Sequence, residues 1–201
     1  MAKGTTAGSG KTMTRRGRPR SAGTTAAILN SAYALMADAG LSAASIDAIA
    51  RHSNVSKMTI YKWWPSREAL LIDAFLNQAA LTLPLSGSGS PAARLRRHAA
   101  SYAEALRGEF GRVQLAVISE CIASTGSAEL FQQRYLQVRR TALIEIIAAG
   151  QADGSIPAGG APADLYDALY GSLFYRYVFG IKPLSPAAAR HLVDTLLQLK
   201  S

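Results

Sequence analysis

Apolar residues recur at spacings of three and four along most of the chain, which is the period of an α-helix with one buried face. The first such stretch runs from Thr24 to Ala39, and Gly40 supplies a C-terminal stop. Beyond residue 90 the same spacing predicts further helices over 91–107, 110–123, 127–150, 163–180 and 186–200. No alternating run predicts a strand, so the expected fold class is all-α.

Residues 45–75 show several helix boundaries close together. Ser45, Ser56 and Ser66 each precede a helical stretch and are predicted N-caps, and Pro65 ends the helix at 57–64. Asn54 lies in the turn between two short helices, where its side chain tolerates a left-handed backbone. The apolar positions of this unit, expected to form one small core with the helix at 24–39, are Ile46, Ile49, Ala50, Val55, Ile60 and Trp64. The unit is therefore a predicted helix-turn-helix.

The opposite face of the second short helix is basic, hydroxylated and aromatic. Its members are Lys57, Met58, Thr59, Tyr61, Lys62 and Trp63. A helix with this composition suits the major groove of DNA, where it bonds to base edges and phosphates together. The alternative is a solvated helix in an ordinary bundle, which explains an exposed Tyr and Trp beside two Lys poorly.

Charge is concentrated in the first third of the 201 residues. The chain has 22 Lys and Arg against 13 Asp and Glu, a net charge of +9. Residues 1–67 hold ten of these basic and two of these acidic side chains, so they account for +8 of the total. This segregation favours a polyanionic partner held by one end of the protein, although a solubilising tail would also be basic.

Residues 1–22 are mostly Gly, Ser, Thr, Lys and Arg, with little to bury, and are expected to form a disordered basic arm. The sequence Arg-Gly-Arg-Pro-Arg at 16–20 is similar to the core of an AT-hook, which enters a narrow A·T minor groove. Nonspecific attraction to phosphates is the simpler interpretation of this short motif.

The run from Gly40 to Phe75 resembles the DNA-binding domain of the TetR/AcrR family of transcriptional regulators. The matching motifs are Ile49-Ala50, Val55-Ser56, Thr59-Ile60-Tyr61, Trp64 and Ser66-Arg67-Glu68-Ala69-Leu70. Asn54 replaces the usual Gly, and His52-Ser53 replaces a commoner Ala-rich helix end. The resemblance implies a helix-turn-helix DNA-binding domain at 23–68 and a larger helical ligand-binding and dimerisation domain at 69–201.

The same resemblance implies which residues contact DNA. Arg67 is included because its charge and the N-terminus of the fourth helix both attract phosphate. The predicted DNA-contacting set is Ser45, Asp47, Lys57, Met58, Thr59, Tyr61, Lys62, Trp63 and Arg67.

Two features of the larger region predict partners. Apolar residues cover more than one stripe of the helix at 163–180, so a homodimer through 163–180 and 186–200 is expected; the alternative buries both faces within one chain. An apolar cavity with few polar groups would bind a small, largely apolar effector. The candidate ligand-binding residues, for each of which plain core packing is the alternative, are Tyr102, Phe110, Gln114, Val117, Tyr135, Arg139 and Phe174.

Enzymatic chemistry is not indicated. His52, His98 and His191 lack metal-ligand spacing, no glycine-rich nucleotide loop follows a strand, and neither a cofactor nor a catalytic residue is expected. Cys121 reads as a buried small hydrophobe, with a redox sensor as the alternative. No apolar stretch is long enough to span a membrane and no signal peptide is evident, so the cytoplasm is the expected location.

Together these observations predict a ligand-responsive transcriptional regulator. It is expected to be a repressor that binds double-stranded DNA at a palindromic operator as a dimer and is released by a small apolar effector. The alternatives are a sequence-indifferent protein that compacts nucleic acid through its arm and head, and a small-molecule carrier with a vestigial head.

Overall fold

The computed structural model describes residues 22–126 and 128–199, and this part of the chain is helical with no strand, which confirms the all-α prediction. The predicted arm therefore lies outside the described residues, apart from Ala22 at the start of the first helix. The elements are α1 (Ala22–Ala39), the 3-10 turn η1 (Leu41–Ala43), α2 (Ile46–Ser53), α3 (Lys57–Trp63), α4 (Arg67–Thr82), α5 (Pro91–Arg107), α6 (Glu109–Thr125), α7 (Glu129–Phe131), the π-helical segment η2 (Gln132–Leu136), α8 (Gln137–Asp153), α9 (Pro162–Phe179) and α10 (Pro186–Leu196).

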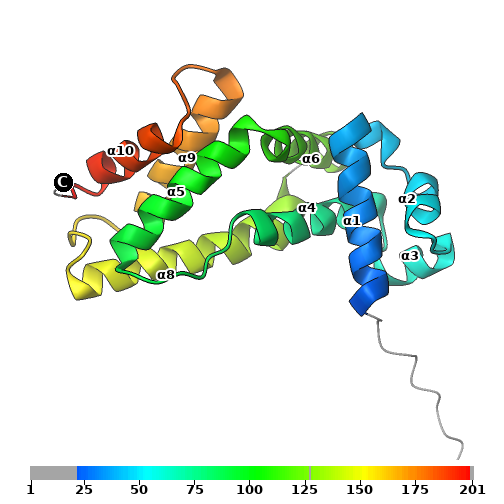
Figure 1. Cartoon of the computed structure of the whole chain (residues 1–201), viewed down its shortest axis with the longest axis horizontal. Helices are drawn as coiled ribbons and strands as arrows, with labels where there is room; N and C mark the ends of the chain where they lie inside the picture. The colour runs from blue at the N-terminus through cyan, green and yellow to red at the C-terminus, as the bar shows by residue number, and fades with distance from the viewer. Residues whose placement is uncertain (1–21, 127, 200–201) are drawn as a thin grey trace, which may run out of the picture.

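The molecule is elongated, with two different ends (Figure 1). Helices α1, α2 and α3 form a head at one end, and α9 and α10 lie toward the other. Helix α4 leaves the head and runs into the body, where it packs on α1, α6 and η2. Helix α5 packs on α8 and α10. Because α4 continues unbroken past residue 68, it belongs to both the head and the body.

Local signals in the sequence set the boundaries of the head helices. The hydroxyls of Ser45, Ser56 and Ser66 accept bonds from the backbone N–H three residues later, at 3.1, 3.2 and 3.1 Å, so all three predicted N-caps are confirmed. Asn54 adopts φ 53° and ψ 43°, the left-handed conformation expected for the turn. These caps and this turn fix the angle at which α3 leaves α2.

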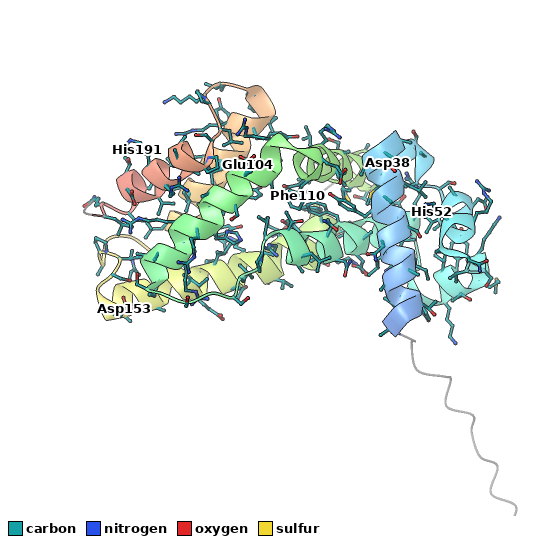
Figure 2. The ribbon with its side chains drawn as sticks, in the orientation of Figure 1. Asp38, His52, Glu104, Phe110, Asp153 and His191 are labelled. Carbon is teal, nitrogen blue, oxygen red and sulfur yellow. The ribbon has the colours of Figure 1, made fainter. Side chains whose placement is uncertain are left out.

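The core is continuous from the head into the body. Ile49, Ile60 and Trp64 are buried in the core, whereas Ile46 and Val55 are partly buried and pack against the core. In the body, the ring of Phe75 on α4 lies 4.9 Å from the rings of both Phe110 and Tyr135. Figure 2 shows Phe110 in the middle of the molecule, between the head and the body helices. The head is thus packed directly onto the body.

Two predicted helices differ from the structure. The expected helix at 127–150 is interrupted by η2 and continues to Asp153, while α10 ends at Leu196, before a turn in which Gln198 has a φ of 49°. A π-helical segment widens one turn of an otherwise regular helix. The spacing of apolar residues does not reveal such a change, because it depends on the helices packed alongside.

Candidate DNA-reading surface and ligand cavity

Helix α3 has one buried and one exposed face. Ile60 is fully buried, whereas Met58 is 78% exposed and Tyr61 is 52% exposed. Lys57 and Lys62 are exposed beside them. We call Lys57, Met58, Tyr61 and Lys62 the reading face. Helix α3, which carries this face, lies at the head end of the molecule (Figure 1).

The other predicted residues near α3 are partly engaged within the head. Trp63 is half-buried, packs on the core, and has its ring centroid 5.8 Å from that of Trp64. Thr59 shares a 2.9 Å hydrogen bond with the hydroxyl of Ser56. Ser45 is occupied as the cap of α2, and Asp47 forms an ion pair with Lys57. Sequence reasoning predicted the cap at Ser45, but it assigned no partner within the head to Trp63, Thr59 or Asp47.

Arg67 faces inward rather than toward the reading face. Its Nε donates to the carbonyl of Ala44 at 3.1 Å, and Nη2 donates to the carbonyl of Leu41. Its Nη1 lies 2.6 Å from Oε1 of Glu120 on α6. The guanidinium therefore joins η1, α4 and α6, and the DNA-contacting set we propose below leaves it out.

Replacing Arg67 by Met is expected to lower the stability of the protein without changing the salt dependence of DNA binding. The substitution removes donors from two backbone carbonyls, which costs about 1–3 kcal/mol per unsatisfied buried group. Thermal unfolding and binding across a salt series measure both effects, with exposed Arg107→Met as the control. If Arg67→Met instead lowers the salt slope of DNA binding by about one per subunit, Arg67 contacts a phosphate.

The body contains a cavity of about 400 Å³ lined by residues of α5, α6, η2, α8 and α9. Five of the predicted ligand-binding residues line it: Tyr102, Gln114, Tyr135, Arg139 and Phe174. Phe110 and Val117 are not among the lining residues, although both are buried in the core like several residues that are. The remaining lining side chains are mainly apolar or aromatic. They include Leu83, Ile118, Phe131, Leu136, Leu143, Tyr166 and Tyr170.

The polar groups of the lining are few, and most of them are hydrogen-bonded in two separate sets. Gln114 Nε2 donates to the Tyr102 hydroxyl at 3.1 Å. Nε2 of His98 lies 3.2 Å from Nη2 of Arg139, and Nδ1 of His98 lies 2.7 Å from the Tyr170 hydroxyl. Sequence reasoning missed His98 and Tyr170. The spacing of four between His98 and Tyr102 on one helix was an available signal that they share a face.

Burial sets the charge states in the cavity. It lowers the pKa of His98 to about 3, with the nearby Arg139 cation acting in the same direction. It also raises the pKa of Tyr102 and of Tyr170 well above the ordinary phenol value. At neutral pH the imidazole is therefore uncharged and both phenols keep their protons.

The other residues with possible metal-binding or redox chemistry, two histidines and one cysteine, do not form a common site with the cavity. His52 lies on the head and His191 on α10, far apart in the molecule (Figure 2). Cys121 is buried, and burial followed by the charges of Glu68 and Glu120 raises the pKa of its thiol, which disfavours the reactive thiolate. Within residues 22–126 and 128–199, no helix is long and apolar enough to cross a membrane.

A helix-turn-helix head joined to a helical body with its own cavity is the architecture of a DNA-binding transcriptional regulator. The chain belongs to the TetR family: residues 28–74 match the model of bacterial regulatory proteins of the tetR family, and residues 85–196 match the tetracyclin repressor-like C-terminal domain. The resemblance stated from the motifs of residues 40–75 is thereby confirmed. Members of this family are transcriptional regulators, which are not enzymes.

Individual relatives agree with this assignment. An uncharacterised HTH-type transcriptional regulator of Bacillus subtilis, YdeS, is 34% identical over 89% of this chain and 90% of its own length. The TetR-family regulator SCO0332 has a crystal structure that superposes with a TM-score of 0.76, at 27% identity over 87% of this chain and 97% of that one.

A third relative shares the fold at lower identity. AibR, solved in complex with isovaleryl coenzyme A and operator DNA, superposes with a TM-score of 0.57 at 19% identity, covering 88% of this chain and 100% of its own. Its similarity concerns the fold alone.

Proposed function

We propose that this protein is a repressor that binds a palindromic operator as a homodimer and is released by a small, largely apolar effector. The reading face carries the proposal. Lys57, Met58, Tyr61 and Lys62 are solvent-exposed on a helix whose other side is anchored in the head core. That arrangement leaves two cations, an aromatic hydroxyl and an apolar side chain available to phosphates and base edges. Because such a repressor acts on chromosomal DNA, we propose that it works in the bacterial cytoplasm.

The homodimer is proposed through α9 and α10, at the end of the molecule opposite the head. Within residues 22–126 and 128–199, ten large apolar side chains are exposed, and four of them fall within seven residues: Tyr175, Val178, Phe179 and Ile181. A cluster of this kind marks an interaction surface. A two-fold axis there would place two reading faces on one DNA duplex, as a palindromic site requires.

Changing Phe179 to Glu is expected to convert the dimer to a monomer. Phe179 is 65% exposed in the single chain, so a charge there leaves the fold of the monomer intact but would be desolvated in the interface. Light scattering after gel filtration reports the mass. Leu81→Glu is the matched control, because Leu81 is 70% exposed on α4, outside the proposed interface. A Phe179→Glu protein that stays dimeric would place the interface elsewhere.

We propose that effector binding in the cavity is transmitted to α3 through η2 and α4, and that DNA is released as a result. Tyr135 and Leu136 of η2 line the cavity, and their neighbour Arg134 bonds to both carboxylate oxygens of Asp73 at 3.0 and 3.1 Å. The same carboxylate accepts a 2.8 Å bond from Nε1 of Trp64, directly after α3. An effector that displaces η2 would thus shift the C-terminal end of α3, because the Arg134–Asp73 and Asp73–Trp64 hydrogen bonds connect the two segments.

The decisive experiment is selection from a random DNA library with the purified protein, followed by sequencing. We expect an enriched palindrome whose half-sites are about one helical turn apart or a multiple of it. No enriched palindrome would contradict the proposal. Addition of candidate effectors to the selected operator complex then tests release directly.

The two alternative functions give different results in the same assay. A compacting protein would lose most of its affinity on deletion of residues 1–22 and show no preferred site, whereas a repressor keeps its site preference. A carrier with a vestigial head would bind no DNA. The exposed basic face of α3 favours the repressor, because neither alternative requires a helix shaped in this way.

A further inference from the structure

Arg139 is a buried cation without an acidic partner. Its side chain lines the cavity and the residue is 7% exposed. The ion pairs of the described residues involve other basic side chains. Asp167, at the same cavity, is held by Arg140 through bonds of 3.0 and 2.7 Å. A buried charge of this kind is costly unless something compensates it.

The protein compensates the charge only in part. Nη1 of Arg139 donates to the carbonyl of Ala79 at 3.4 Å, and Nη2 contacts the carbonyl of Leu83 and Nε2 of His98. Both carbonyls lie at the C-terminal end of α4, where the helix dipole supplies about half a negative charge. These contacts use three of the five N–H donors of a guanidinium, so two have no acceptor among the described residues.

The hydrogen bonds of His98 leave a second donor, the Tyr170 hydroxyl, on a residue that lines the cavity. A guanidinium has no acceptor, so Nε2 of the neutral imidazole must accept from Arg139, and the proton lies on Nδ1. Nδ1 then donates to the oxygen of Tyr170. The Tyr170 proton is therefore free to be donated elsewhere, and Tyr170 also lines the cavity.

The rest of the cavity limits the kind of molecule that satisfies these donors. Its walls are formed largely by apolar and aromatic side chains, including Ile118, Phe131, Leu143 and Phe174. Among the described lining residues, Arg139 is the one permanent cation. A single positive charge matches a carboxylate, whereas a phosphate monoester carries nearly two negative charges at neutral pH.

We propose that the ligand of this cavity is a small amphipathic carboxylic acid, whose carboxylate pairs with Arg139 and accepts the Tyr170 proton while its apolar body packs on the aromatic wall. Its role as the effector rests on the proposed function, but its binding does not. A volume of about 400 Å³ falls at the lower end of the range for small-molecule sites, which suits a compact acid.

The test compares acids with their uncharged amides on the full-length protein by isothermal titration calorimetry. The probes are 4-phenylbutyrate with 4-phenylbutyramide, and decanoate with decanamide. A charge-assisted bond to a buried partner predicts that each acid binds about 10- to 100-fold more tightly than its amide. Amides that bind as tightly as the acids, or no binding by either acid, would overturn the proposal.

Arg139→Gln isolates the charge, because Gln retains an N–H donor for the end of α4. We expect this variant to lose the preference for acids while binding the amides within about threefold of the wild type. Arg107→Gln makes the same chemical change at an exposed position of α5 that does not line the cavity, and it should keep the preference. Equal weakening of acid and amide by Arg139→Gln would mean that Arg139 only supports the fold.

A second variant covers the case in which Arg139→Gln does not fold. Tyr170→Phe removes one hydroxyl without touching α4, and we expect it to reduce acid binding by about three- to tenfold relative to the amide. An unchanged ratio of acid to amide would exclude the second donor and overturn the proposal as stated.

Operator binding tests the carboxylate ligand and the proposed release of DNA separately. If acids bind but the operator complex persists, the cavity assignment stands and the proposed release mechanism fails. If the operator is released by the amides as readily as by the acids, the proposed function stands and the carboxylate assignment fails.

Discussion

Replacing Tyr61 and Lys62 together by Ala is expected to weaken operator binding by about 100-fold or more while leaving thermal unfolding unchanged. Both side chains are exposed on α3. Each lost base or phosphate contact costs about 1–3 kcal/mol, and a dimer loses each contact twice. Fluorescence anisotropy with the selected operator, repeated over a salt series, measures the loss and the change in slope.

Two further variants test whether the loss of operator binding is specific to the reading face. Arg107→Ala removes a positive charge from an exposed surface pair with Glu104 on α5, away from the reading face, and should leave operator affinity within about twofold. The Lys62→Ala substitution alone should lower the salt slope by about one per subunit. Wild-type affinity in the double variant would show that DNA is read by another surface.

Trp64→Ala is expected to lower the free energy of unfolding by about 3–5 kcal/mol, the range for truncating a large buried aromatic side chain. Trp64 is 3% exposed, and its Nε1 bonds to Asp73 on α4. The loss therefore opens a cavity in the head and also leaves the Asp73 carboxylate with one donor fewer. Urea unfolding followed by circular dichroism, at a fixed protein concentration, measures the change.

Trp64→Phe separates the two contributions. Phe keeps most of the buried ring but cannot donate to Asp73, so we expect a smaller loss, of about 1–3 kcal/mol. If Trp64→Phe is as damaging as Trp64→Ala, the bond to Asp73 rather than the packing of the ring holds the end of α3 in place. If neither variant loses stability, the head core does not depend on this side chain.

The parts of the head that sequence predicts well are governed by neighbours in the chain. Ser45, Ser56 and Ser66 cap helices through bonds that span three residues, and Asn54 forms a local turn. Burial of Ile60 and exposure of Tyr61 follow from helical spacing alone. Such features require no knowledge of the rest of the fold.

The parts that sequence predicts poorly depend on distant packing. Arg67 turns inward because α6 brings Glu120 next to it, 53 residues away in the chain. His98 meets Tyr170 across 72 residues, so it looked isolated in the sequence. Phe110 and Val117 follow the same helical spacing as true cavity residues, and only the positions of the surrounding helices decide which side chains border the empty space.

If α3 reads DNA as proposed, the ion pair between Asp47 and Lys57 has a consequence for how the protein searches a genome. Lys57 already pairs with an anion on the same head, the carboxylate of Asp47. Contact with a random stretch of duplex would therefore exchange one negative partner for another and bring Asp47 close to the phosphates, where like charges repel. This exchange would weaken binding to nonspecific sites, and the protein would stay longer only where base contacts by neighbouring side chains offset it.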